Sequence, residues 1–180
     1  MNNKTILRDN LFDITKVLAN HSVPCCILSG TLLGFIRDKD FIDNDLDVDV
    51  GVIVNGAIDL IAWYKIFRNL ESLGFTFRRA GTSSVITIDR GFGSDIWWIF
   101  KKWDENHKPY YALRAWNGEF RYAAQHFDNF EEIEYQNRTF KIPSNSEGFL
   151  ESTYGPDWKT PNPNFKHPMD SPCFRPTKKD

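Results

Sequence analysis

The feature that most restricts how this chain can fold is a short segment in which carboxylate and aliphatic side chains alternate. Its six residues are, in order, Asp45, Leu46, Asp47, Val48, Asp49 and Val50. Successive side chains of a β-strand point to opposite faces, so the alternation predicts a half-buried strand over residues 45–50. The three aliphatic residues would anchor the core face of this strand, and the three aspartates would share the other face.

Three carboxylates on one strand face raise one another's pKa and cost stability, unless a cation or a proton offsets their charge. A divalent ion is the natural partner, because Mg²⁺ binds one or two protein carboxylates together with the phosphate oxygens of a substrate. The alternative is an exposed acidic strand edge, on which charges discourage aggregation. The alternation by itself leaves both interpretations open.

A turn of small residues precedes the acidic segment and favours the metal interpretation. Residues 25–28 form a short apolar run typical of a buried strand, and residues 32–37 are predicted to form a short helix. Between them lie Ser29, Gly30 and Thr31, whose small side chains let backbone N–H groups and the helix N-terminus approach a phosphate. Such residues also begin helices by capping alone. Joined to the acidic segment, they predict a phosphate-and-metal site.

A third carboxylate, Asp95, stands at the start of a predicted strand over residues 95–100, where an aspartate is unfavourable. A strand beside the acidic one would bring Asp95 to the same metal ions. There it would ligate an ion or accept the proton of an attacking hydroxyl. The alternative is an aspartate that only makes a hydrogen bond in a turn.

The rest of the chain interleaves helical and strand-like patterns, which predicts a single α/β or α+β sheet domain. Ser144 and Glu147 form a predicted capping box for a last helix. Six of the nine prolines lie within residues 156–180, so we expect a catalytic domain over residues 1–155 and an extended C-terminal tail that packs on it. The other predicted elements are helices over residues 7–19 and 58–73 and strands over residues 75–79, 85–89, 110–115 and 131–142.

The composition limits which classes of binding partner and which cellular compartment we expect for this chain. The formal net charge of −2 argues against a general nucleic-acid binder, which normally carries a basic face. No apolar run reaches the length of a signal-peptide core or a membrane span, so we expect a cytoplasmic protein without an integral membrane segment. The three cysteines fit neither a disulfide framework nor a zinc site and are expected to be reduced.

Two longer motifs resemble the signature of the LicD and fukutin family. The first spans residues 28–37 and continues through residues 41–42 and 45–49, and the second spans residues 154–161. The resemblance implies the nucleotidyltransferase fold, in which helices flank a mixed β-sheet. It also implies that Gly30 forms the glycine turn of that fold and that three aspartates are its catalytic and metal-binding residues. These aspartates are Asp47, Asp49 and Asp95.

The family resemblance further implies a reaction and its participants. The reaction is transfer of a phospho-alcohol, such as phosphocholine or a polyol phosphate, from a CDP-activated donor to a hydroxyl of a glycan, in cell-surface polysaccharide modification. The implied cofactor is Mg²⁺ or Mn²⁺. Two alternatives are a nucleotidyltransferase that moves a nucleoside monophosphate from an NTP to a small molecule or a protein, and an inactive binding or scaffold member of the fold.

Further residues near the two motifs offer contacts to a substrate. Arg37 would hold a phosphate oxygen or simply end a solvated helix, and Lys159 lies in a segment that would close the site or merely terminate the last helix. Several tryptophans would stack on a base, enclose an ammonium group, or serve only in packing. The expected phosphate contacts are Ser29, Gly30, Thr31, Arg37 and Lys159, and the tryptophans are Trp97, Trp98, Trp103 and Trp116.

Overall fold

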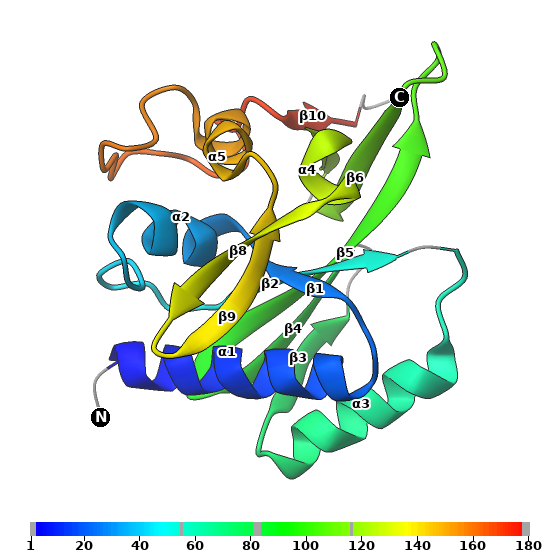
Figure 1. The fold of residues 1–180 in the computed structure, drawn as a ribbon, viewed down its shortest axis with the longest axis vertical. Coiled ribbons are helices and arrows are strands. Elements are labelled where there is room, and N and C mark those ends of the chain that lie inside the picture. Colours follow the sequence, from blue (N-terminus) through cyan, green and yellow to red (C-terminus); the bar gives the residue numbers. More distant parts are fainter. Residues whose placement is uncertain (1–2, 55, 81–83, 116, 178–180) are drawn as a thin grey trace.

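The computed structural model describes residues 3–54, 56–80, 84–115 and 117–177, and it shows helices packed on a mixed β-sheet (Figure 1). The predicted fold class is therefore confirmed. None of the helices in these four stretches is long and apolar enough to cross a membrane. The helices are α1 (Asn3–Asn20), α2 (Ser29–Arg37), α3 (Leu60–Ser72), α4 (Gln125–Asp128) and α5 (Ser146–Tyr154). The strands are β1 (Cys25–Ile27), β2 (Asp49–Val54), β3 (Thr76–Ala80), β4 (Val85–Arg90), β5 (Phe92–Trp103), β6 (Pro109–Ala115), β7 (Gly118–Ala123), β8 (Phe130–Tyr135), β9 (Arg138–Pro143) and β10 (Phe174–Pro176).

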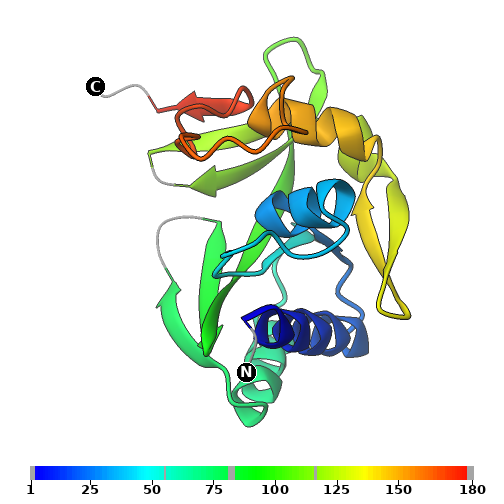
Figure 2. The ribbon, with the colours of Figure 1, turned by 90° about the vertical axis from the view of Figure 1, so that its left-hand side faces the viewer.

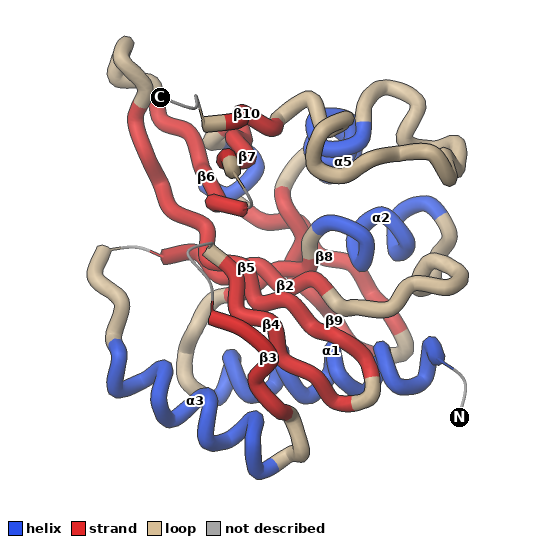
Figure 3. Tube along the Cα trace, turned by 180° about the vertical axis from the view of Figure 1, so that it is seen from behind, coloured by secondary structure: helices blue, strands red, loops and turns tan. Residues whose placement is uncertain are grey.

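The long strand β5 organises the main sheet. Its first half lies between β2 and β4, and its last residues pair with β6, which continues the sheet through β7 to β10. Figure 3 shows β2, β5, β4 and β3 side by side from behind. Within the described strands, β2 and β5 form the one parallel pair, and their register places Asp49 opposite Asp95. Strands β8 and β9 form a separate antiparallel hairpin.

Helices α1 and α2 cover one side of the sheet, with α5 beyond α2 (Figure 2). The apolar residues of α1 recur at helical spacing, and Leu7, Leu11 and Leu18 are fully buried against the sheet. Helix α3 begins at the cap Asp59, whose side chain accepts hydrogen bonds from two backbone N–H groups of the first turn. Helix α2 packs on β2, and the Leu28 N–H donates to the Asp49 carbonyl, so the turn at Ser29 lies against the first residue of that strand.

The acidic segment departs from the half-buried strand that the alternation predicts. Strand β2 begins only at Asp49, although Leu46 and Val48 already exchange backbone hydrogen bonds with Gly93 and Asp95 of β5. The side chain of Leu46 is 60% exposed, so its predicted core role is wrong. Strand β2 itself is buried on both faces, as expected of a strand in the interior of a sheet covered by helices.

Three further features differ from the sequence predictions. The predicted strand over residues 131–142 is a hairpin, because Gln136 and Asn137 take positive φ angles and turn the chain back. The last helix is capped by Asn145, whose side chain accepts from the Gly148 N–H, and the predicted capping box with Ser144 is therefore wrong. Strand β7 is absent from the sequence predictions.

The proline-rich tail is attached to the main sheet. Strand β10 pairs with β7, so that Phe174 lies opposite Phe120, and the backbone N–H of Cys173 donates to the Ser152 carbonyl of α5. The three cysteines are free thiols, and burial raises the pKa of Cys25 and Cys173 to about 11.

Candidate active site

The carboxylate of Asp49 is held between helix α2 and strand β5. It is 7% exposed, and its Oδ2 accepts a hydrogen bond from the Gly30 N–H at 3.1 Å. Its Oδ1 accepts one from the indole Nε1–H of Trp97 at 2.9 Å. The Asp49 backbone N–H in turn donates to the Thr31 hydroxyl oxygen at 2.9 Å. The start of α2 thus orients the first residue of β2.

Asp95 lies beside Asp49 because the parallel register makes the two residues direct partners. Its Oδ1 accepts a hydrogen bond of 2.6 Å from the Thr87 hydroxyl on the neighbouring strand β4. Partners in one register position of adjacent strands point to the same face of a sheet, so both carboxylates face the same side. The structure therefore brings Asp95 to the acidic segment, as its sequence position predicts.

Asp45 and Asp47 approach the same place from the extended segment that precedes β2. Asp45 Oδ2 is buried and receives no hydrogen bond from any described residue. Gly30 faces this oxygen, since a Cβ atom at Gly30 would lie 3.2 Å from Asp45 Oδ2 and 3.6 Å from Asp49 Oδ2. The bare backbone of Gly30 therefore lets two carboxylates approach the start of α2, which is the role of a glycine where backbone comes close to charged groups.

Burial raises the pKa of all four carboxyl groups, and neighbouring carboxylate charges add to this rise for Asp47, Asp49 and Asp95. Burial, together with the charge of Asp45, raises the pKa of Asp47 from its ordinary 3.8 to about 6. Burial and the neighbouring charge of Asp47 raise the pKa of Asp49 well above its ordinary value, and the Trp97 hydrogen bond opposes this rise. Burial also raises the pKa values of Asp45 and Asp95. Such mutual destabilisation is typical of sites that bind a cation.

The chemistry of these groups fits a divalent ion. All the candidate donors are hard carboxylate oxygens, the kind that Mg²⁺ and Mn²⁺ prefer, and the buried Asp45 Oδ2 has no hydrogen-bond donor among the described residues to satisfy it. In the described part of the chain no three acidic, histidine or cysteine side chains already stand as a ready-made ligand group. The fit of a divalent ion therefore rests on the oxygen donors of the aspartates, on their burial and on their negative charge.

The residues expected to contact phosphate are not all in one place. Gly30 and Thr31 bond to Asp49, and Ser29, with a positive φ of 45°, is the first residue of α2. Arg37 lies at the other end of α2 and is paired with Asp38 by two hydrogen bonds of 2.8 Å.

Lys159 lies elsewhere, on the surface. Its Nζ forms an ion pair of 2.8 Å with Glu147 and stands over the Trp158 ring. Lys159 is not among the residues that line the large cavity beside α2.

A cavity of about 820 Å³ lies beside α2 and is lined by Arg37 and Tyr154. The charges of Asp49, Asp45 and Asp47 add to burial in raising the pKa of the Tyr154 phenol well above the ordinary value. Tyr154, at the end of α5, thus lines the cavity and is close enough to the acidic segment for its phenol to be affected by those charges. The other lining residues come from α2, the loop after it and the tail: Leu33, Ile42, Asp43, Asp157, Trp158, Thr160, Pro161, Asn162, Pro163 and Phe165.

Two residues of the site, Trp97 and Tyr154, are missed by the sequence analysis. There Trp97 is only a stacking or packing residue, and Tyr154 is only part of the second motif. The other tryptophans lie apart from the aspartates: the Trp98 ring packs against Trp63 of α3 at 5.1 Å, and Trp103 is 61% exposed. Trp116 lies outside the described residues.

Comparisons with known proteins agree with this fold. Residues 22–145 match a family model described as LicD/FKTN/FKRP, nucleotidyltransferase domain. The chain resembles a solution structure of the antibiotic-resistance factor ANT(2'')-Ia with a TM-score of 0.56 and 12% identity, over 93% of this chain and 80% of that one. It is also similar to a lincosamide antibiotic adenylyltransferase, LnuA, with a TM-score of 0.49 and 17% identity, over 79% and 82%. A comparison with curated proteins found no match.

Proposed function

Because this chain belongs to the LicD/FKTN/FKRP nucleotidyltransferase family, we propose that it transfers a phospho-alcohol from a CDP-activated donor to a hydroxyl group of a glycan. The transferred group would be phosphocholine or a polyol phosphate, and the acceptor a cell-surface polysaccharide or its precursor. The observation that carries the proposal is that Asp45 and Asp49 approach the bare backbone of Gly30, with Asp95 opposite Asp49 in the register and the charge of Asp47 acting on Asp49, all within the matched region.

We assign the metal ligands to Asp47, Asp49 and Asp95. A bound Mg²⁺ or Mn²⁺ would neutralise the charge of the donor diphosphate and align the reacting oxygens. Asp49 is already oriented by Gly30 and Trp97, and Asp47 is half-buried in the extended segment before it. The negative charge of these aspartates favours the binding of a cation at this place and disfavours the binding of a further anion.

The remaining groups would bind and orient the substrates. Arg37 supplies positive charge to the cavity, where a phosphate of the donor would be held by charge-assisted hydrogen bonds. Asp95 Oδ1 accepts from Thr87, which leaves Oδ2 either to ligate the ion or to take the proton of the acceptor hydroxyl. The acceptor oxygen would bond to the phosphorus that carries the alcohol, and the bond from that phosphorus to CMP would break.

The first test is thermal unfolding with a panel of nucleotides, since a ligand that binds only the folded protein raises the unfolding midpoint. The panel contains CDP-choline, CDP-glycerol, CDP-ribitol, CTP and ATP, each with and without Mg²⁺. We expect a magnesium-dependent rise with one CDP-alcohol. A rise only with an NTP would instead favour nucleotidyl transfer, and no rise with any compound would favour a scaffold.

Two substitutions show whether the acidic cluster is responsible. Asp47→Asn should abolish the magnesium-dependent rise while the protein remains folded. Asp9→Asn is the matched control, because Asp9 is an exposed aspartate of α1 paired with Arg8. An Asp47→Asn protein that keeps the full rise would overturn the site assignment.

A further inference from the structure

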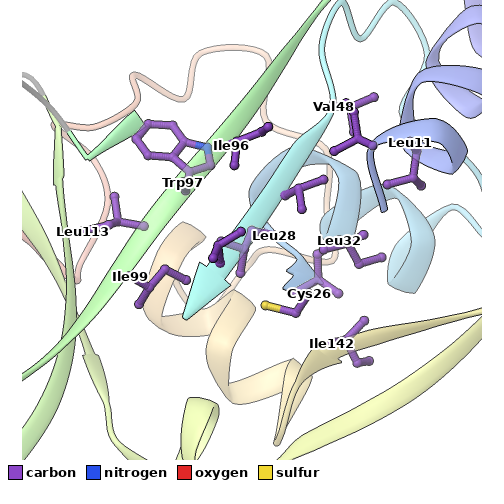
Figure 4. Close-up of a cluster of buried hydrophobic side chains, with 14 of the residues drawn as sticks. Leu11, Cys26, Leu28, Leu32, Val48, Ile96, Trp97, Ile99, Leu113 and Ile142 are labelled. Atoms are coloured by element: carbon purple, nitrogen blue, oxygen red, sulfur yellow. The ribbon is translucent and has the colours of Figure 1, made fainter. Parts of the chain in front are cut away.

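The indole of Trp97 is a buried hydrogen-bond donor within reach of a proposed metal ligand. Its Nε1–H donates to Asp49 Oδ1 at 2.9 Å, and both side chains are 7% exposed. Figure 4 shows Trp97 on β5 at the margin of the buried apolar cluster, with its indole nitrogen toward β2. A buried indole N–H usually finds a hydrogen-bond acceptor, and here that acceptor is the carboxylate of a proposed metal ligand.

The bond from Trp97 completes a fixed arrangement of Asp49. The Gly30 N–H holds Oδ2 from the side of α2, and the indole N–H holds Oδ1 from the side of β5. A carboxylate gripped on both oxygens cannot turn about its χ2 angle without losing a bond in a place that water does not reach. Both oxygens of Asp49 therefore keep a constant direction.

We propose that Trp97 is a positioning residue, which sets the orientation of the Asp49 carboxylate for the divalent ion. The inference rests on the proposed function, because it presupposes that Asp49 binds a metal. Groups that hydrogen-bond to metal ligands fix the ligand geometry, and their loss typically weakens metal binding about 10- to 100-fold. Trp97 acts only through Asp49 and is not itself in contact with the reacting atoms.

The neighbouring tryptophan provides a matched comparison. Trp98 follows Trp97 on β5 and points to the opposite face, where its ring packs against Trp63. Its Nε1 is buried and has no hydrogen-bond partner among the described residues. Replacing either tryptophan by phenylalanine removes similar volume, but only the change at Trp97 removes a bond to Asp49.

The experiment measures Mn²⁺ binding by electron paramagnetic resonance of the free ion, for the wild-type chain, Trp97→Phe and Trp98→Phe. We expect Trp97→Phe to weaken Mn²⁺ binding about tenfold or more, and Trp98→Phe to stay within about twofold of wild type. Equal weakening in both variants, or binding by Trp97→Phe that matches wild type, would overturn the role of Trp97. Absence of Mn²⁺ binding by the wild-type chain would overturn both this role and the proposed function.

A second replacement keeps the test valid if Trp97→Phe does not fold. Benzothienylalanine at position 97 retains the size of the indole and carries sulfur in place of the N–H group. It should therefore preserve packing and still weaken Mn²⁺ binding about tenfold. Unchanged binding by this folded variant would show that the ring, and not its hydrogen bond, matters.

Discussion

Removing the charge of Asp47 should stabilise the metal-free protein, although it should also destroy the proposed metal site. Burial and the charge of Asp45 raise the Asp47 pKa from 3.8 to about 6, so the folded state holds the Asp47 proton more tightly than the unfolded chain does. Between these two pKa values the folded protein binds more protons, and its stability therefore falls as pH rises. The amide introduced by Asp47→Asn carries no charge at any pH.

The size of the effect follows from the same pKa change. One pKa unit corresponds to about 1.36 kcal/mol, so the full change is worth roughly 3 kcal/mol above pH 6. Asp47 is only half-buried, and water screens part of this energy, which leaves an expected gain of about 1–3 kcal/mol for Asp47→Asn at about pH 7.5. At about pH 4.5 the folded wild-type protein is already protonated at Asp47, so the gain should fall to about a third.

Urea unfolding in the presence of EDTA measures this gain at the two pH values. Asp9→Asn serves as the control and should change the unfolding free energy by less than about 1 kcal/mol at either pH, because exposed ion pairs contribute little. Addition of Mg²⁺ should then stabilise the wild-type protein but not Asp47→Asn. A loss of stability in Asp47→Asn at the higher pH, or a gain that does not depend on pH, would refute the reasoning.

Two other substitutions test the packing around β2 and the role of the cavity beside α2. Gly51→Ala would place a Cβ atom 2.4 Å from Leu28 Cδ1 and 2.9 Å from Ile99 Cδ1. We expect the free energy of unfolding, measured with urea, to fall by about 1–3 kcal/mol. Unchanged stability would mean that β2 and its neighbours move apart easily. Arg37→Gln removes the guanidinium that pairs with Asp38. It should raise the dissociation constant of the nucleotide donor about tenfold in titration calorimetry, because a charged hydrogen bond is worth roughly 1.5–3 kcal/mol. An unchanged constant would place the donor phosphates elsewhere.

Much of the fold could be predicted because local patterns and structure agree. The apolar residues from Leu7 to Leu18 recur at helical spacing, and β1 and the later strands are short apolar or alternating runs. Each of these patterns depends only on the secondary-structure preference of its own segment. The position of Asp95 beside Asp49 agrees with what the family resemblance implies, whereas the local pattern leaves Asp95 open as a turn residue because it does not say which strands are neighbours. The family match confirms the resemblance over residues 22–145.

What could not be predicted depends on contacts between distant segments. The period-two pattern places Leu46 in the core, but β2 becomes a regular strand only where α2 covers it, so Leu46 remains at the surface. No local signal distinguishes Trp97 from Trp98, because their different roles depend on which face of β5 meets Asp49. Lys159 pairs with Glu147 because the tail folds back along α5, a path that its prolines alone do not specify.

The parallel register of β2 and β5 limits where insertions and deletions can be tolerated in the evolution of this chain. Asp49 and Asp95 face one another only while Val50 stays opposite Ile96 and Val54 opposite Phe100. Insertion or deletion of a single residue within either strand would turn every following side chain of that strand to the other face and disrupt this register. The turn between β5 and β6, over residues 104–108, is largely exposed and lies beyond this paired region, so it should accept extra residues freely. We therefore expect length variation among related chains to gather in such turns and to spare both strands.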